Sequence, residues 1–153
     1  MLSRYTGSEA YCRGPSIQSA LRIRRDNAMV LGIGTDLMEI ERIAQSVDRF
    51  GERFLRRIFT RREIQYCQQK KNAAESFAAR FAAKEAGAKA LGTGISQGVG
   101  WLELEVVRQP GGRPTLELSG RAAGRAREMG VVRVSLSLTH SKNLALAVVV
   151  MEG

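Results

Sequence analysis

The chain has 153 residues, enough for one domain with its own core, and 44% of them are hydrophobic. Its net charge of +9 favours anionic partners: nucleic acid, acidic membranes, phosphorylated cofactors or an acidic protein. The single histidine excludes paired-histidine zinc motifs, and two cysteines without metal spacing indicate a reducing compartment, so we expect a cytoplasmic protein. The longest apolar run, Leu144 to Met151, is far short of the ~20 residues of a membrane helix, so no membrane partner is expected.

Residues 1–28 differ from the rest of the chain. They contain five arginines with scattered Gly and Ser, and they lack the apolar segment of a signal peptide. We expect a disordered N-terminal extension, with a short amphipathic helix around Ile17 to Ile23 as the alternative. The compact domain is expected to span residues 29–153.

The first element of this domain is predicted to be a short buried strand, Val30 to Ile33, closed by Gly34. Asp36 and Glu39 then have the spacing of a capping box, which predicts a helix that begins at Asp36. The apolar stripe of this helix comprises Leu37, Ile40, Ile43, Ala44 and Val47.

More helices follow. A short helix is predicted for Arg53 to Ile58, and Thr60 with Glu63 forms a second capping box that opens a helix towards Gln69. Asn72 caps a third helix, which ends near Leu91 because Gly92 suits a helix C-cap.

The second half is predicted to be rich in strands, which are 101–107, 114–118, 133–139 and 144–151, with a short helix at 120–129. Helices gathered early and strands gathered late favour an α+β domain with a small antiparallel sheet over alternating βαβ units.

Two acidic residues stand out in this basic chain. Asp36 follows a Gly-x-Gly step that lacks the third glycine of a dinucleotide fingerprint, so the simple interpretation is a helix cap. Glu85 and Lys89 have the spacing of a surface helix pair, but Phe81 lies in the same row and favours a cleft wall. Two carboxylates beside a lysine suit a magnesium ion and phosphate-transfer chemistry.

The other charged residues also have ordinary structural interpretations that compete with a functional role. Lys84 and Arg80 form a basic row, usually solvated. The arginines around Arg57 form a dense basic cluster, typical of a solvated face, a nucleic-acid patch or a docking surface for an acidic protein. His140 follows a strand and is more often a turn residue than a catalyst, and no nucleophile elbow accompanies it.

Several segments occur together in the order and spacing of a known family. They are Gly32-Ile33-Gly34-Thr35-Asp36, Phe59-Thr60-Arg61-Arg62-Glu63, the helix Arg80 to Ala90 with Gly92-Thr93-Gly94, and Ser135 to Ser141. From Met29 to the C-terminus the chain resembles the holo-acyl-carrier-protein synthase family, the small, trimeric type of 4′-phosphopantetheinyl transferase. Met38 stands where the larger, pseudodimeric type carries a second acid.

The resemblance implies transfer of 4′-phosphopantetheine from coenzyme A to a serine of apo acyl carrier protein, in fatty acid biosynthesis. The other product is adenosine 3′,5′-bisphosphate, and the cofactor is magnesium, with manganese as an alternative. Active sites are implied between the subunits of a homotrimer.

The resemblance also assigns residues. Asp36 and Glu85 would be metal ligands, Lys89 would contact the pyrophosphate, and all three would be catalytic. The base is either Glu85 or a metal-bound water. Lys84 and His140 would lie near the coenzyme A phosphates. Carrier-protein docking would use Arg42, Arg49, Arg53 and Arg57.

Two other functions compete with this hypothesis. One is the same chemistry on a dedicated carrier domain of a polyketide or peptide synthase. The other is a basic nucleic-acid-binding module, which leaves the acidic pair without a purpose, so no nucleic-acid partner is expected.

Overall fold

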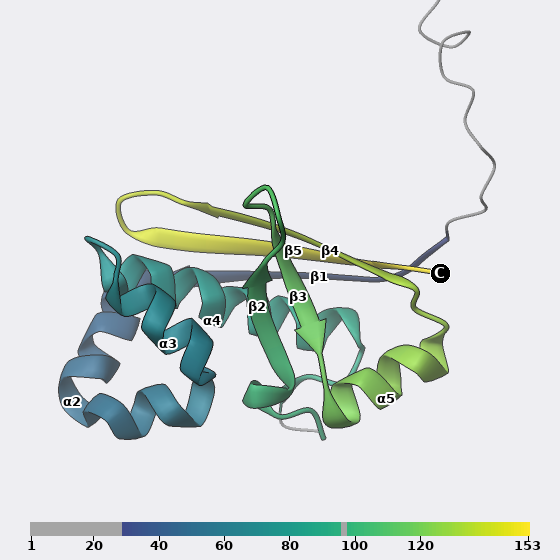
Figure 1. The fold of residues 1–153 in the computed structure, drawn as a ribbon, viewed down its shortest axis with the longest axis horizontal. Helices are drawn as coiled ribbons and strands as arrows, with labels where there is room; N and C mark the ends of the chain where they lie inside the picture. Colours follow the sequence, from purple (N-terminus) through teal and green to yellow (C-terminus); the bar gives the residue numbers. More distant parts are fainter. Residues whose placement is uncertain (1–28, 96–97) are drawn as a thin grey trace, which may run out of the picture.

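The chain folds into two antiparallel sheets and a set of helices in a computed structural model that describes residues 29–95 and 98–153 (Figure 1). The strands are β1 (Val30–Glu39), β2 (Leu104–Arg108), β3 (Pro114–Leu118), β4 (Arg133–His140) and β5 (Leu144–Glu152). The helices are α2 (Ile40–Ile58), α3 (Arg61–Gln68), α4 (Ala73–Ala90), the 3-10 helix η2 (Trp101–Glu103) and α5 (Gly120–Met129). The predicted α+β class is confirmed, whereas the predicted extension at residues 1–28 lies outside the described residues.

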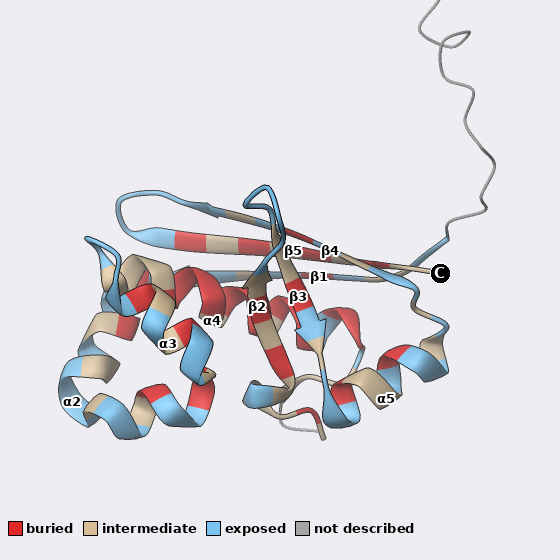
Figure 2. Ribbon diagram, in the orientation of Figure 1, coloured by how far each residue is buried: buried red, intermediate tan, exposed pale blue. Residues whose placement is uncertain are grey.

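The larger sheet has the strand order β1-β5-β4, and β2 and β3 form a separate hairpin. The helix α4 runs beneath the larger sheet, with α2 and α3 at one end and α5 at the other (Figure 1). Buried residues follow this arrangement, since they concentrate on α4, β5 and the hairpin (Figure 2).

The strand β1 is much longer than predicted, and the predicted helix start at Asp36 is wrong. Asp36 lies inside β1 opposite Ala147, and α2 begins only at Ile40, after Glu39. The Asp36–Glu39 spacing matches a capping box, but continuous pairing with β5 satisfies this backbone instead. Local propensity therefore yields to tertiary pairing.

Two glycines of β1 allow α4 to lie directly on the strand. A Cβ atom on Gly32 would overlap the carbonyl oxygen of Ala90, and one on Gly34 would overlap the carbonyl oxygen of Ala86. The Gly-x-Gly step thus serves close helix–strand packing, and it brings Asp36, two residues further along the same face, next to the helix.

The other helix boundaries agree better with the sequence. The Thr60 hydroxyl accepts a hydrogen bond from the Glu63 amide and the Glu63 carboxylate accepts one from the Thr60 amide, which confirms that capping box. The Asn72 cap of α4 is also confirmed.

Two boundaries differ from the prediction. The helix predicted for residues 53–58 is the second half of α2, which kinks at Gly51, where φ is 53°. Residues 101–103 form η2, so β2 begins at Leu104 and not at Trp101.

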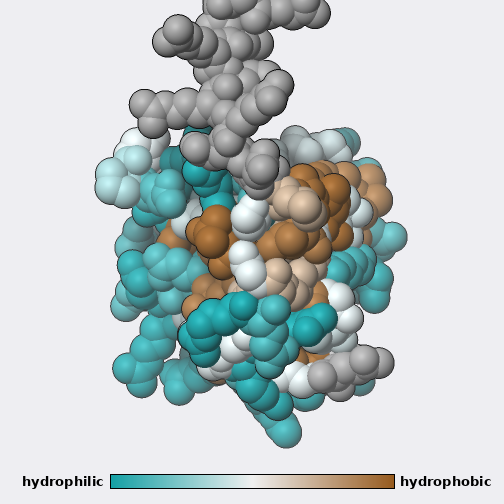
Figure 3. All heavy atoms as spheres, turned by 90° about the vertical axis from the view of Figure 1, so that its right-hand side faces the viewer, coloured by the Kyte–Doolittle hydropathy of each residue, from teal (hydrophilic) through white to brown (hydrophobic). Residues whose placement is uncertain are grey.

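The face of the larger sheet that points away from α4 is rich in apolar side chains. On β1, Ile33 and Leu37 are 61% and 56% exposed, opposite Val150 and Leu146 of β5. Figure 3 views the end where β1 starts and shows an apolar area there, to which Met29, Val30 and Val132 contribute exposed side chains. No helix in the described part of the chain is long and apolar enough to cross a membrane.

Candidate active site

Asp36, Glu85 and Lys89 meet where β1 passes over α4. The Lys89 ammonium donates to Asp36 Oδ1 at 2.8 Å and to the Thr35 carbonyl oxygen at 2.9 Å. Glu85 lies one helical turn before Lys89, and the electrostatic effect of both Asp36 and Lys89 on its carboxylate places all three charges together. The structure therefore brings together the three residues that the sequence assigned to the reaction.

The negative charges of the Asp36 and Glu85 carboxylates are only partly balanced by nearby positive charge. Asp36 Oδ2 is buried and has no hydrogen-bond partner among the described residues. Partial burial and the Asp36 carboxylate raise the pKa of Glu85, and Lys89 only partly opposes them. One lysine thus faces two acids, and the site has a deficit of positive charge.

This charge deficit predicts how Glu85 titrates in the metal-free protein. Replacing Lys89 with Met should raise the pKa of Glu85 further, because the cation that favours the carboxylate is lost. Asp36→Asn should lower it, because the repelling charge is lost. Carboxyl carbon chemical shifts measured by NMR across the acidic range would test both signs, and a shift in the same direction for the two variants would contradict the arrangement.

The donor set fits a hard divalent cation. Magnesium binds one or two protein carboxylates and completes its shell with water and substrate phosphates. The described residues contain no cluster of three or more His, Cys, Asp and Glu side chains, so Asp36 and Glu85 are the protein donors that this site offers. The unpartnered Asp36 Oδ2 is a free oxygen for such an ion.

The expected contact between Lys84 and coenzyme A is not available in this structure. The Lys84 side chain is 0% exposed and its ammonium lies 2.8 Å from Glu63 Oε2. It also donates to the carbonyl oxygens of Trp101 and Leu104. Burial lowers the pKa of Lys84, and Glu63 opposes that effect. Lys84 thus ties α4 to α3 and β2, and it presents no charge to a ligand.

His140 lies at a second site, beside the start of α4. Its Nδ1 is 2.9 Å from Glu75 Oε1, and the side chain is 53% exposed. A cavity of about 250 Å³ adjoins it, lined also by Tyr66, Ser76, Arg80 and Arg108. Sequence reasoning missed Tyr66 and Arg108 because only the fold brings α3, α4 and β2 together here.

Arg80 corrects the expectation of a solvated basic row. It is only 6% exposed, and its Nε has no hydrogen-bond partner in the described part of the chain. The two sites are separate within one chain, because Glu75 and Glu85 are ten residues apart on α4, or about 15 Å along its axis.

The predicted docking arginines form one exposed series on α2, comprising Arg42, Arg49, Arg53 and Arg57. None of them makes an ion pair with another described residue. Arg53 and Arg57 flank a cavity of about 350 Å³ whose other lining residues are Phe50 and Phe54. The second half of α2 thus combines free positive charge with an apolar notch.

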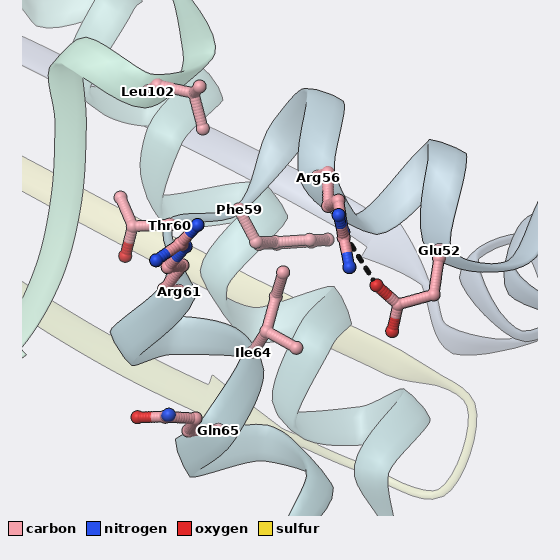
Figure 4. Close-up of a pocket in the computed structure, with 8 residues that line it drawn as sticks. All are labelled: Glu52, Arg56, Phe59, Thr60, Arg61, Ile64, Gln65 and Leu102. Atoms are coloured by element: carbon pink, nitrogen blue, oxygen red, sulfur yellow. Dashed lines mark hydrogen bonds and ion pairs between the residues drawn. The ribbon is translucent and has the colours of Figure 1, made fainter.

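A further cavity, of about 510 Å³, is lined by residues of α2, α3 and η2 and of the link between α2 and α3 (Figure 4). Phe59 and Ile64 form its apolar floor, and the ion pair between Arg56 and Glu52 lies at its rim (Figure 4). No residue that the sequence assigned to a site lines it.

Comparison with known proteins identifies the group to which this architecture belongs. The sequence profile described as the 4′-phosphopantetheinyl transferase superfamily matches residues 32–149. A holo-acyl-carrier-protein synthase from Koribacter versatilis (strain Ellin345) is 56% identical over 124 residues, which cover 81% of this chain and 99% of that protein.

Comparison with solved structures points to the same family. The holo-acyl-carrier-protein synthase of Neisseria meningitidis has a TM-score of 0.75 at 37% identity and covers 82% of this chain and 100% of its own. The Helicobacter pylori enzyme, solved in complex with coenzyme A, has a TM-score of 0.69 at 34% identity and covers 78% and 98%. The chain therefore belongs to the 4′-phosphopantetheinyl transferase superfamily, within the holo-acyl-carrier-protein synthase family.

Proposed function

We propose that this protein transfers the 4′-phosphopantetheine group of coenzyme A to a serine of an apo acyl carrier protein. The observation that carries the proposal is the meeting of Asp36, Glu85 and Lys89 at the contact of β1 with α4, in a chain of this family. The serine oxygen attacks the phosphorus that bears pantetheine. The bond from this phosphorus to the bridging oxygen breaks, and adenosine 3′,5′-bisphosphate leaves.

The chain's own groups have distinct roles in this step. Glu85, whose carboxylate lies beside Asp36 and Lys89, accepts the serine proton. The Lys89 ammonium, held by Asp36 and the Thr35 carbonyl, donates to pyrophosphate oxygens and offsets the charge that develops on them. Asp36 and Glu85 would hold magnesium, which would supply positive charge to offset that of the pyrophosphate.

The nucleotide end of coenzyme A needs a second positive site, and we assign its 3′-phosphate to the pocket between His140 and Arg80. Arg80 offers an unpartnered Nε, and Glu75 orients the His140 ring through Nδ1. Because this pocket and the acidic pair are separate within one chain, we propose that each active site is completed by an adjacent subunit of a homotrimer. The apolar outer face of the larger sheet supports such an assembly.

The proposed trimer can be tested by placing a charged side chain on the apolar outer face of the larger sheet. Ile33→Asp should convert a trimer into a monomer, because 61% of the Ile33 side chain is exposed in one chain and a buried carboxylate at an interface is costly. Light scattering after size exclusion measures the mass. Leu102→Asp is the control, since Leu102 is 49% exposed on η2, away from the sheet. A trimeric Ile33→Asp variant would exclude this face as the interface.

We propose that the arginines of α2 dock the acidic carrier protein. Arg53→Glu should raise KM for the carrier about tenfold, with KM for coenzyme A unchanged, because charge reversal at an interface slows encounter and weakens the complex. The effect should shrink as salt is added. Arg127→Glu on α5 makes the same charge change at an exposed site without an ion pair among the described residues. Equal effects of the two substitutions would contradict docking on α2.

The proposed reaction is tested by mass spectrometry of an apo acyl carrier protein incubated with this protein, coenzyme A and magnesium. The expected result is a gain of one phosphopantetheine group that EDTA abolishes. A panel of carriers from fatty acid, polyketide and peptide synthesis identifies the acceptor, for which we propose the carrier of fatty acid biosynthesis. No modification of any carrier would refute the proposal.

A further inference from the structure

Three cationic side chains from different parts of the chain lie close to the ring of Tyr66, on α3. The distances from its ring centroid are 4.0 Å to the guanidinium carbon of Arg80, 4.3 Å to the ammonium of Lys70 and 5.3 Å to the guanidinium carbon of Arg108. The three cations repel one another, and the negative face of the aromatic ring attracts each of them.

The charges of these cations are not neutralised within the described residues. None of the three side chains makes an ion pair there. Arg80 donates through one terminal nitrogen to the Ser76 carbonyl at 3.3 Å, while its Nε, in a side chain that is 94% buried, has no partner. Two acids line the adjoining cavities: Glu105 already accepts from Thr60 and lies 3.9 Å from Arg62, and Glu75 lies 2.9 Å from His140 Nδ1. A nearly buried guanidinium without a counter-ion indicates a site for an anion.

The space beside this cluster suits a small, doubly charged anion. Two cavities, of about 250 and 220 Å³, adjoin Arg80, and Tyr66 and Arg108 line both. His140 opens onto the first, and its Nδ1 lies 2.9 Å from Glu75 Oε1. A phosphate monoester carries nearly two negative charges at neutral pH and matches such a set of donors.

We propose that Tyr66 is a positioning residue for this phosphate: its ring holds Arg80, Lys70 and Arg108 together, so that Arg80 and Arg108 face the 3′-phosphate of coenzyme A and Lys70 adds positive charge beside them. The proposal rests on the proposed function for the identity of the ligand. Tyr66 does not touch the reacting atoms. Its contribution is to keep three mutually repelling cations in place before the phosphate arrives, which lowers the cost of ordering them on binding.

The titration of Tyr66 agrees with this geometry. Partial burial alone would raise the pKa of the phenol, but Lys70, Arg108 and Arg80 outweigh it and hold the pKa below its usual value. A tyrosine that only packed against the core would not experience this positive potential.

The test compares the binding of coenzyme A with that of 3′-dephospho-coenzyme A, measured by titration calorimetry in the presence of magnesium. Tyr66→Leu removes the ring, and Tyr66→Phe keeps it. We expect Tyr66→Leu to weaken coenzyme A about tenfold and Tyr66→Phe to bind within about twofold of the wild type. Both variants should bind the dephospho ligand like the wild type. The control is Gln68→Leu, on an exposed position of the same helix.

Carrier modification distinguishes this proposal from the proposed function. At saturating coenzyme A, Tyr66→Leu should keep a kcat within about twofold of the wild type. Equal weakening of both ligands, no weakening of coenzyme A, or wild-type protein that binds neither ligand would overturn the proposal. Binding that depends on Tyr66 without carrier modification would instead refute only the reaction.

A milder variant covers the case in which Tyr66→Leu does not fold. Arg108→Gln, at the exposed end of β2, should weaken coenzyme A about threefold and leave the dephospho ligand unchanged. If Arg108→Gln binds each of the two ligands as tightly as the wild type does, that result would likewise count against the cluster.

Discussion

Asp36→Asn and Glu85→Gln should each reduce carrier modification by about a thousandfold or more. Each substitution keeps the shape of the side chain and removes one of the two carboxylates that the described residues offer to a cation. Glu85→Gln also removes the group that we propose accepts the serine proton. Single-turnover experiments, with the carrier mass measured at each time point, separate a loss of chemistry from a loss of binding.

The matched control is Glu117→Gln, an exposed position of β3. It makes the same chemical change away from the site and should retain full activity. Glu85→Gln should melt at a slightly higher temperature than the wild type in EDTA, because the neutral amide avoids the cost of burying a charge and the repulsion by Asp36, which together raise the pKa of Glu85. Undiminished transfer by both site variants would remove Asp36 and Glu85 from the reaction.

Lys84→Met should lower the free energy of unfolding by about 3 kcal/mol, or the melting temperature by roughly 10 °C. The substitution leaves the Glu63 carboxylate, 0% exposed, without its cation inside the protein. Glu63 still accepts from the Thr60 and Val106 amides, which limits the loss. Chemical denaturation followed by circular dichroism measures the change.

A double substitution shows whether stability depends on the Glu63–Lys84 ion pair or on Lys84 alone. The double variant Glu63→Gln/Lys84→Met carries no buried charge here and should recover part of the lost stability, so the two changes should be non-additive. KM for coenzyme A should stay near the wild-type value in the single variant at a temperature where it is folded. A many-fold rise in that KM with unchanged stability would instead restore Lys84 to the coenzyme site.

The sequence predicted features that depend on local chemistry. The capping box of Thr60 and Glu63 depends on residues three apart, and it forms as expected. The burial of Lys84 depends on a partner 21 positions earlier in the chain, and no local pattern identifies such a pair. Asp36 shows the limit most clearly, because its spacing from Glu39 predicts a cap, while pairing with β5 makes it a strand residue.

The proposed catalytic residues were predicted mainly by resemblance, and the structure supplies the physical reason for their proximity. No periodicity in the sequence relates Asp36 to Glu85. Their encounter depends on Gly32 and Gly34, which let α4 lie against the backbone of β1. The proposed phosphate pocket could not be predicted in full, because Tyr66, Arg80 and Arg108 belong to different elements.

The small number of protein donors at the acidic site has a thermodynamic consequence. Two carboxylates cannot complete the six-oxygen shell that magnesium prefers, so water or phosphate oxygens must supply the rest. Affinity for the cation should therefore be low in the protein alone and higher once a pyrophosphate is in place. By linkage, the cation must strengthen the binding of coenzyme A by the same factor. With so few protein donors, magnesium and the coenzyme would be expected to bind cooperatively, each strengthening the binding of the other.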